Sequence, residues 1–350
     1  MSLLTPFQLR RRFLRIAGTT AAVWGLGMGR ASAQPASAAT GAEAPQPLQQ
    51  LQQLRIGYQK SAVNLVILKQ RGVLEKRFPG TKITWAEFPA GPQLLEALSV
   101  GSLEFGLTGD SPPVFAQAAG KDLLYVAAEP PKPDSSAILV LRDSPIKALA
   151  DLKGKKIALQ KGSSAHYLLV RAVEKAGLQW SDIQPIYLAP ADARAAFERK
   201  SVDAWAIWDP FYAAVELDIQ PRALVTGRSL SSNNSFYLAS RAFATHNGVA
   251  LAVLLQELSG ADAFVQKNRK EAIKLIADFS GLDAGIVSLF IQRRPVSPVA
   301  PLNAATVADQ QRVADAFFKL GLIPRPVQVA QIVWRPDPAR LAQLNQLNLK

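Results

Sequence analysis

Cysteine is absent from this chain of 350 residues, and histidine occurs only twice, at His166 and His246. Without cysteine the protein has no disulfide bond, no thiolate metal ligand and no cysteine nucleophile. Two imidazoles are too few for a zinc site built on several histidines. We therefore expect neither a metal nor a cofactor.

Several motifs of nucleotide and acyl chemistry are also missing. No G-x-G-x-x-G fingerprint follows the first predicted strand, and the segment at Lys161 lacks the longer glycine-rich loop of a P-loop. No G-x-S-x-G elbow is present. Covalent catalysis needs a nucleophile paired with a base, and the sequence offers no evident pair. These absences argue against an enzyme.

Acidic residues are in the minority. The chain has 40 Lys and Arg against 27 Asp and Glu, a formal net charge of +13. Residues 1–33 contribute five arginines and no acidic residue, which leaves +8 for the remainder. A positive surplus favours anionic ligands or a membrane surface. The basic residues are dispersed and form no nucleic-acid-binding motif, so we expect no nucleic acid partner.

The N-terminus has the features of an export signal. Three consecutive arginines from Arg10 are followed by Phe-Leu-Arg, then by a small and apolar run at 16–29, and an A-x-A site ends at Ala33. This order is typical of a secretory signal, and the run is too short to span a membrane. The arginine pair resembles the twin-arginine motif, although an ordinary secretory signal with extra arginines is an alternative. We predict a signal peptide at residues 1–33, cleaved near Ala33, and a periplasmic location.

The remainder predicts an α/β protein. Residues 34–53 are rich in Ala, Pro and Gln and predict a disordered tether. Strands are then expected at 54–58, 82–88, 103–107, 123–128, 137–141, 156–160, 183–187, 204–207, 223–225 and 236–239. Helices are expected at 61–71, 92–100, 112–119, 146–152, 165–176, 191–199, 210–215, 249–264, 269–279, 284–290 and 306–320. This alternation predicts a largely parallel sheet. One lobe (54–140 and 236–350) is interrupted by another (141–235).

Small polar residues follow several predicted strands and precede helices. They occur at Gln59, Lys60, Thr108, Gly109, Asp110, Gly162, Ser163 and Ser164. Ligands bind at the carboxyl ends of strands in open α/β sheets, and free amides at a helix start bind anions. Serine and aspartate also cap helices everywhere, so capping is the alternative for any one loop. Three such loops in one chain favour a binding site.

Two tryptophans lie near the end of the strand at 204–207. Because side chains alternate across a strand, Trp205 and Trp208 lie on opposite faces. Trp208 is next to the turn at Asp209, so it is the better candidate to line a pocket, where an indole packs on an apolar ligand tail. Core packing is the alternative for both. His166 stands at a helix start, where it could donate to an anion, although a lone histidine is more often structural.

Taken together, eight segments resemble the aliphatic sulfonate-binding branch of the periplasmic substrate-binding proteins of ABC importers. The segments are 55–60, 88–93, 106–113, 129–133, 160–166, 190–197, 202–212 and 235–239. The resemblance extends from residue 54 to about 336. It implies the type II periplasmic-binding-protein fold, in which two lobes, each a sheet flanked by helices, are joined by a two-segment hinge. We place the crossings near 137–142 and 235–239.

The resemblance also implies which residues line the cleft between the lobes. They are Gln59, Lys60, Gly91, Pro92, Thr108, Gly109, Asp110, Gly162, Ser163, Ser164, Ala165, His166, Trp208, Asp209, Ser235, Phe236 and Tyr237. The sulfonate head would contact helix-start amides and hydroxyls, with Trp208 beside the tail.

The implied function is capture of an aliphatic sulfonate for sulfur acquisition, by a monomer that delivers it to an ABC permease in the inner membrane. Taurine, a sulfate ester, nitrate or a pyrimidine are alternatives within the same class. Taurine would need an acid near its ammonium group, and Asp110 and Asp209 could serve. A third alternative is an enzyme on this scaffold, but the pyrimidine-forming relatives have a cysteine-containing motif that this chain lacks.

Overall fold

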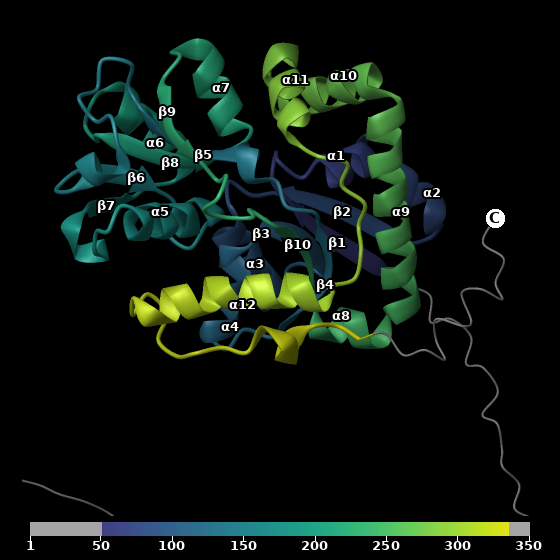
Figure 1. Cartoon of the computed structure of the whole chain (residues 1–350). Helices are drawn as coiled ribbons and strands as arrows, with labels where there is room; N and C mark the ends of the chain where they lie inside the picture. The colour runs from purple at the N-terminus through teal and green to yellow at the C-terminus, as the bar shows by residue number, and fades with distance from the viewer. Residues whose placement is uncertain (1–50, 336–350) are drawn as a thin grey trace, which may run out of the picture. The chain divides into compact units, whose positions relative to one another are not determined.

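A computed structural model describes residues 51–335. The predicted signal peptide, most of the predicted tether and residues 336–350 lie outside the described residues. Figure 1 shows two α/β lobes side by side, with the helices of the C-terminal third, drawn from green to yellow, packed beside and below them.

The first lobe is built on a five-stranded sheet with the order β2-β1-β3-β10-β4. Its strands are β1 (Gln53–Tyr58), β2 (Lys82–Glu87), β3 (Phe105–Gly109), β4 (Leu123–Glu129) and β10 (Ser235–Ser240). All are parallel except β10, which runs antiparallel to both β3 and β4.

The second lobe has a sheet of the same design, with the order β7-β6-β8-β5-β9. Its strands are β5 (Ser136–Val140), β6 (Lys156–Leu159), β7 (Gln184–Tyr187), β8 (Ala204–Trp208) and β9 (Arg222–Thr226). Here β5 is the reversed strand, antiparallel to β8 and β9. The expected α/β class with largely parallel sheets is confirmed, with one reversed strand in each lobe.

The reversed strands are the first ones after each passage between lobes. The chain leaves the first sheet at Glu129 and enters the second at Ser136, then leaves at Thr226 and returns at Ser235. The crossings are therefore residues 130–135 and 227–234. The expected crossings at 137–142 and 235–239 are wrong, and residues 136–140 belong to the second lobe, because these segments pair inside the sheets as β5 and β10.

Helices cover both sheets. Those of the first lobe are α1 (Val63–Gln70), α2 (Val73–Arg77), α3 (Gly91–Ser99), α4 (Ser111–Ala118), α8 (Arg241–His246), α9 (Gly248–Lys267), α10 (Arg269–Ser280), α11 (Ala284–Arg293) and α12 (Ala304–Lys319). Those of the second are α5 (Ser164–Lys175), α6 (Pro190–Glu198) and α7 (Phe211–Asp218). The short α2 and α8 are not anticipated by the sequence pattern, and the helix expected at 146–152 is only a 3₁₀ turn, Leu149–Leu152.

The second sheet lies between two hydrophobic cores, and alternate residues of its strands pack into one core or the other. Ile138 and Ala206 belong to one cluster, whereas Leu139 and Trp205 belong to the other. Trp205 is fully buried. The alternation predicted for the two tryptophans therefore holds, because residues 205 and 207 share one face of the sheet.

Among residues 51–335, one helix, α9, is long and apolar enough to cross a membrane by length and composition. It packs instead against α1, α2 and α10 of the first lobe, with Leu251, Leu254 and Leu258 fully buried. Asp262, a buried residue of α9, pairs with Arg294 through its carboxylate. These contacts identify α9 as a core helix of the lobe.

Candidate functional site

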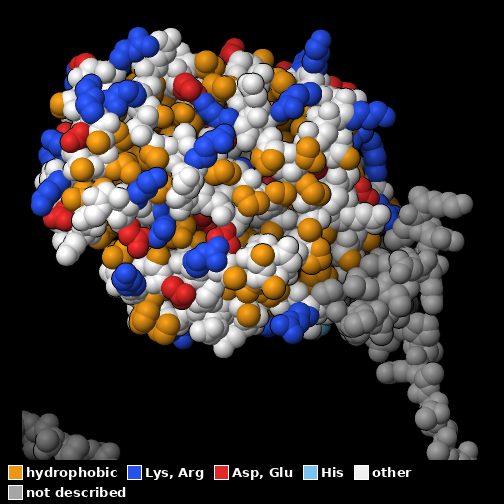
Figure 2. Space-filling model, viewed as in Figure 1, with side chains coloured by type: hydrophobic (Ala, Val, Ile, Leu, Met, Phe, Trp, Pro, Cys, Tyr) orange, Lys and Arg blue, Asp and Glu red, His pale blue; other side chains and the backbone are white. Residues whose placement is uncertain are grey.

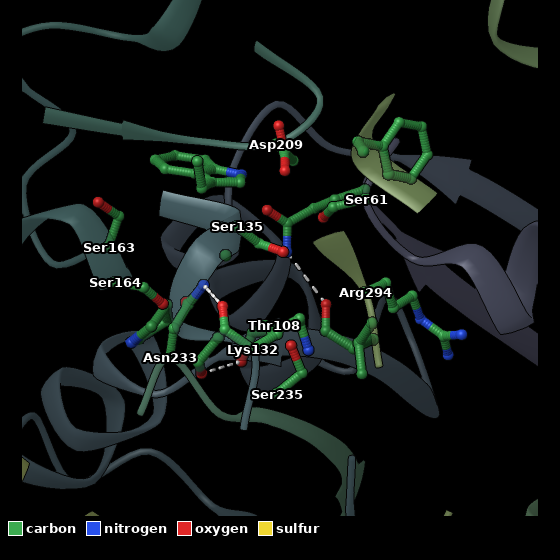
Figure 3. Close-up of a pocket in the computed structure, with 17 residues that line it drawn as sticks. Ser61, Thr108, Lys132, Ser135, Ser163, Ser164, Asp209, Asn233, Ser235 and Arg294 are labelled. Atoms are coloured by element: carbon green, nitrogen blue, oxygen red, sulfur yellow. Dashed lines mark hydrogen bonds between the residues drawn. The ribbon is translucent and has the colours of Figure 1, made fainter. Parts of the chain in front are cut away.

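A pocket of about 60 Å³, lined by both polar and apolar side chains, lies between the two lobes, where the carboxyl ends of strands and the starts of helices from both lobes meet (Figure 3). It is lined by Gln59, Ser61, Gly91, Leu107, Thr108, Gly109, Pro112, Lys132, Ser135, Ser163, Ser164, Trp208, Asp209, Asn233, Ser235, Phe290 and Arg294. Lining residues come from both lobes and both crossing segments, so the pocket exists only while the lobes are together.

The structure brings about half of the sequence-predicted site residues to this pocket. Those that line it are Gln59, Gly91, Thr108, Gly109, Ser163, Ser164, Trp208, Asp209 and Ser235. Those that do not are Lys60, Pro92, Asp110, Gly162, Ala165, His166, Phe236 and Tyr237. Most of the second group lie in the hydrophobic core or behind the pocket wall.

Four helices begin around the pocket without a side-chain cap. These are α1, α3, α4 and α5, and no side chain at their N-cap positions accepts a bond from the helix start. Ser163 precedes α5, but its hydroxyl donates to the carbonyl of Gln160 at 2.8 Å. Capping is therefore not the role of Ser163 here, and the first amides of α5 remain available to an anion.

Glycine at the cleft allows close approach between the lobes. A Cβ atom on Gly109 would lie 1.9 Å from the hydroxyl oxygen of Ser164, which belongs to the other lobe. Within the first lobe, a Cβ on Gly91 would lie 2.6 Å from Pro112 of α4. Side chains at these two positions would keep the walls of the pocket apart.

A buried ionic network supports the pocket from behind. The ammonium of Lys132 lies 3.2 Å from Glu129, whose carboxylate also accepts from the hydroxyl of Tyr237 at 2.8 Å. Arg294 donates to Asp262 at 2.8 Å. Burial alone would raise the pKa of Glu129, but Lys132 and Arg294 outweigh it and hold this pKa below its ordinary value. Tyr237 thus lies behind the pocket wall and does not line it.

Lys132, Ser135, Asn233 and Arg294 are lining residues that sequence reasoning missed. The segment 129–133 belongs to the family resemblance, so its lysine could have been nominated. Arg294 has no comparable signal. It reaches the amide oxygen of Asn64, 230 positions away in the sequence, at 3.0 Å.

Arg293 links the two lobes at the opposite side of the pocket. From the end of α11 it donates to Asp209 Oδ1 at 3.0 Å and also pairs with Glu216 of α7. Its guanidinium carbon lies 3.9 Å from the ring centroid of Tyr212. Helices α7 and α11 are in contact, and Figure 1 shows them next to each other at the top of the molecule.

His166 is a structural residue and does not line the pocket. Its Nδ1 accepts from the amide of Gly162 at 3.2 Å, and its ring packs between Phe115 and Phe317 of the first lobe and Trp180 of the second. Burial, with a smaller effect of Lys161, lowers its pKa to about 3. The imidazole is therefore neutral and cannot act as a cationic donor.

The other misplaced residues have equally local reasons. The ammonium of Lys60 donates to the carbonyl of Ser280 at 3.0 Å. Asp110 is buried, accepts from the hydroxyl of Ser111 at 2.9 Å, and has its pKa raised to about 6 by burial. Phe236 packs on Tyr125 inside the first lobe. Ala165 lies in the core of the second lobe, Pro92 sits in the first turn of α3, and Gly162 packs against Phe115.

Within the described range 51–335, no three His, Asp or Glu side chains are grouped as metal ligands. On the face shown in Figure 2, Lys and Arg are scattered among acidic side chains and do not gather in one patch. Two α/β lobes joined by a two-segment hinge, with a pocket between them, define a solute-binding protein.

The chain belongs to the NMT1/THI5-like family, whose model matches residues 82–272. A relative from Escherichia coli (strain K12) is 51% identical over 291 residues, covering 83% of this chain and 91% of the relative. The crystal structure of the periplasmic aliphatic sulphonate binding protein SsuA from Escherichia coli matches with a TM-score of 0.76 and 51% identity, over 82% of this chain and 93% of that one. The alkanesulfonate-binding protein SsuA from Xanthomonas axonopodis pv. citri bound to MOPS matches with a TM-score of 0.79 and 52% identity, over 81% and 98%.

Proposed function

We propose that this protein captures aliphatic sulfonates between its lobes and delivers them to an ABC importer for sulfur acquisition. The observation that carries the proposal is a pocket rich in uncommitted hydrogen-bond donors. Within the part of the chain that the structure describes, the hydroxyls of Ser61, Ser135 and Ser235 have no partner, and uncapped helices begin beside them.

A sulfonate suits this lining better than most anions do. It has three acceptor oxygens and is ionised at any ordinary pH, so binding requires donors and no proton transfer. Helix-start amides carry partial positive charge and stabilise an anion without a bound metal. Trp208 and Phe290 give the same pocket an apolar wall for an alkyl tail. Nitrate and sulfate would accept hydrogen bonds from the same donors, but they have no alkyl group to contact this apolar wall.

The relatives favour the same assignment. Both SsuA proteins are more than 50% identical in sequence to this chain, and the match covers 93% and 98% of their lengths. Both proteins are named for sulfonate binding. They are binding proteins and not enzymes, and this chain, without cysteine, lacks the nucleophile that the enzyme alternative would need.

Transport follows from the two-lobed design. The ligand is enclosed only when the lobes meet, so the closed form presents a surface that an inner-membrane permease can distinguish from the open form. A periplasmic location agrees with that of the E. coli SsuA protein, which is periplasmic. Export by the twin-arginine route, cleavage near Ala33 and a monomeric state are parts of this proposal.

Calorimetric titration of the chain from Gln34 onward tests the proposal. The ligands are methane-, butane- and octanesulfonate, MOPS, taurine, sulfate and nitrate. We expect tight binding of the sulfonates, with an affinity that depends on the tail. Binding of nitrate or sulfate alone would overturn the sulfonate assignment, and conversion of any ligand would overturn the assignment as a binding protein.

A further inference from the structure

Arg293 is the residue whose ion pairs join one lobe to the other. It ends α11 of the first lobe, and both of its acidic partners, Asp209 and Glu216, belong to the second. Of the ion pairs that the structure describes within residues 51–335, no others cross between the lobes. Separation of the lobes would therefore have to break the contacts of Arg293.

The contacts of Arg293 are close and largely buried. Its Nη1 donates to Asp209 Oδ1 at 3.0 Å, its Nη2 pairs with Glu216, and its guanidinium carbon lies 3.9 Å from the ring centroid of Tyr212. The side chain of Arg293 is 14% exposed and that of Asp209 is 5% exposed. Burial alone would lower the pKa of Arg293, but Asp209 and Glu216 outweigh it and raise this pKa. Ion pairs with so little exposure are screened less by salt than surface pairs are.

The bond between Arg293 and Asp209 does not depend on which form of the carboxyl group is present. Burial raises the pKa of Asp209 to about 7, and Arg293 is foremost among the groups that lower it. The oxygen that accepts from Arg293 is Oδ1, which also accepts from the amide of Ala213 at 3.0 Å. Because a proton would occupy the other oxygen, Oδ1 continues to accept from Arg293 across the neutral range.

Arg293 and the next residue, Arg294, hold opposite ends of the first crossing segment. Arg294 turns into the first lobe and lies 3.6 Å from Glu129, the last residue before the crossing. Figure 3 shows its guanidinium pointing away from Asp209. Arg293 instead holds Asp209, whose amide donates at 2.9 Å to the carbonyl of Ser135 at the other end of the crossing. Two consecutive arginines therefore fix both ends of a segment about which the lobes turn.

Neither Arg293 nor Glu216 lines the pocket. A ligand therefore does not touch their bond, and the bond can affect binding only through the closed state. When the state that binds is only part of the population, the apparent affinity falls with that fraction. A contact that stabilises the closed state thus raises the affinity for every ligand by the same factor.

We propose that Arg293 is a positioning residue that sets the affinity for the ligand, and its rate of release, by bracing the two lobes in the closed state. We call Arg293, Asp209 and Glu216 the interlobe brace. The brace determines how readily the lobes close, whereas the pocket determines which ligand is chosen. This inference rests on the proposed function for its ligands, but the brace acts on the lobes with or without them.

Glu216→Gln tests the brace without altering the pocket lining. We expect the Kd for methane-, butane- and octanesulfonate to rise by one common factor of about five, the scale of a partly exposed ion pair, mainly through faster dissociation. Calorimetry and stopped-flow fluorescence measure the two quantities. Asp218→Asn is the matched control, because Asp218 lies on the same helix but pairs with Arg194 of its own lobe. This control should bind as wild-type protein does.

Variants of Arg293 extend the test. Arg293→Met should raise the Kd by about 30-fold, because it also leaves the buried carboxylate of Asp209 without its cation. Arg293→Lys restores a charge but not the fork that serves two carboxylates, so we expect a loss of only about fivefold. Adding Glu216→Gln to Arg293→Met should cause no further loss, because the bond between these residues is already absent.

Spin labels report the separation of the lobes directly. The chain has no cysteine, so Lys270→Cys in the first lobe and Arg199→Cys in the second would carry the only labels. Both positions are exposed. Measured by double electron–electron resonance without ligand, Glu216→Gln should show longer distances than the same labelled protein with Glu216. With saturating butanesulfonate the two distance distributions should agree.

The brace is overturned if Glu216→Gln binds as wild-type protein does, if its loss of affinity varies with the tail of the ligand, or if Asp218→Asn loses as much. Failure of the proposed function looks different, since wild-type protein would then bind none of the sulfonates. The spin labels would still decide on the brace in that case, and label distances unchanged by Glu216→Gln would refute it.

Discussion

Four helix starts at the cleft lack a side-chain cap, whereas three helix starts away from it have one. Around the pocket, α1, α3, α4 and α5 start without a side-chain cap. Away from it, Ser240 accepts from Phe243 N at the start of α8, Asp283 from Gly285 N at α11, and Asn303 from Thr306 N at α12. The division is not complete, because α2, α6, α9 and α10 also begin away from the pocket without a cap. At the pocket itself, Asp209 accepts from the amide of Ala213 in the first turn of α7.

This comparison explains how small polar residues at helix starts can serve either folding stability or ligand binding. A capped helix start has satisfied one of its four free amides internally, and this contributes to folding stability. An uncapped start leaves those amides to water or to an anion. The affinity of the protein for its ligand should therefore depend on the cleft starts, and its stability on the outer starts.

A carboxylate placed at a helix start beside the pocket should have the largest effect on binding. In Ser163→Asp, the new side chain would cap α5 and repel an anionic ligand. We expect the Kd for butanesulfonate to rise about 100-fold, because like charges at a binding site cost several kcal/mol. The free energy of unfolding should stay the same or increase, since aspartate is a good N-cap residue. Calorimetry and urea denaturation measure the two effects.

Ser240→Asp is the matched control, since it makes the same change at the outer start of α8. It should leave the Kd unchanged. An equal loss of affinity in both variants would show that the added charge acts at long range and that the cleft start has no special role.

The first turn of α5 should also make the protein sensitive to acid. The pKa of His166 is lowered to about 3 in the folded protein, from 6.5. Its stabilising effect is complete above pH 6.5 and is lost as the pH falls toward 3, at about 1.4 kcal/mol per pH unit. At pH 4 this amounts to about 3 kcal/mol relative to pH 6.5.

His166→Phe isolates this effect, since phenylalanine suits the surrounding aromatic rings. Urea denaturation of both proteins between pH 4 and 7 gives the difference in unfolding free energy, in which the contributions of Asp209 and the other acids cancel. As the pH is lowered, the unfolding free energy of wild-type protein should fall by about 3 kcal/mol more than that of the variant. A constant difference would contradict the buried, neutral state of His166.

Trp208 separates recognition of the tail from recognition of the head. It lines the pocket and makes an edge contact with Phe211. Trp208→Ala should weaken octanesulfonate by about 30-fold, because apolar contact is lost, and methanesulfonate by less than about threefold. The control is Trp205→Phe in the core behind it, which should lower stability without altering the dependence on tail length. Equal losses for both ligands would make Trp208 merely structural.

Patterns in the sequence predicted most of the strands and helices. They predicted pocket residues only where those residues lie next to a strand end or a helix start. Thr108 was found because it lies at the carboxyl end of β3, and Ser163 because it lies in the short loop between β6 and α5. Phe236 and Tyr237 were predicted wrongly because β10 is a central strand, so its interior residues are covered by the core and only Ser235 emerges at the cleft. Arg294 was missed because its place depends on partners more than 30 and 200 positions away. No local pattern contains that information.

The two ends of β10 provide the mildest and most closely matched test. Ser235 begins the strand at the pocket, and Ser240 ends it as the cap of α8. We expect Ser235→Ala to raise the Kd for butanesulfonate about tenfold, through loss of one hydrogen bond to a charged group, with little change in stability. Ser240→Ala should lower the unfolding free energy by about 1 kcal/mol and leave the Kd unchanged. If each variant altered both quantities, the division between binding and capping helix starts would be wrong, because serines on one strand would then contribute to folding and to recognition alike.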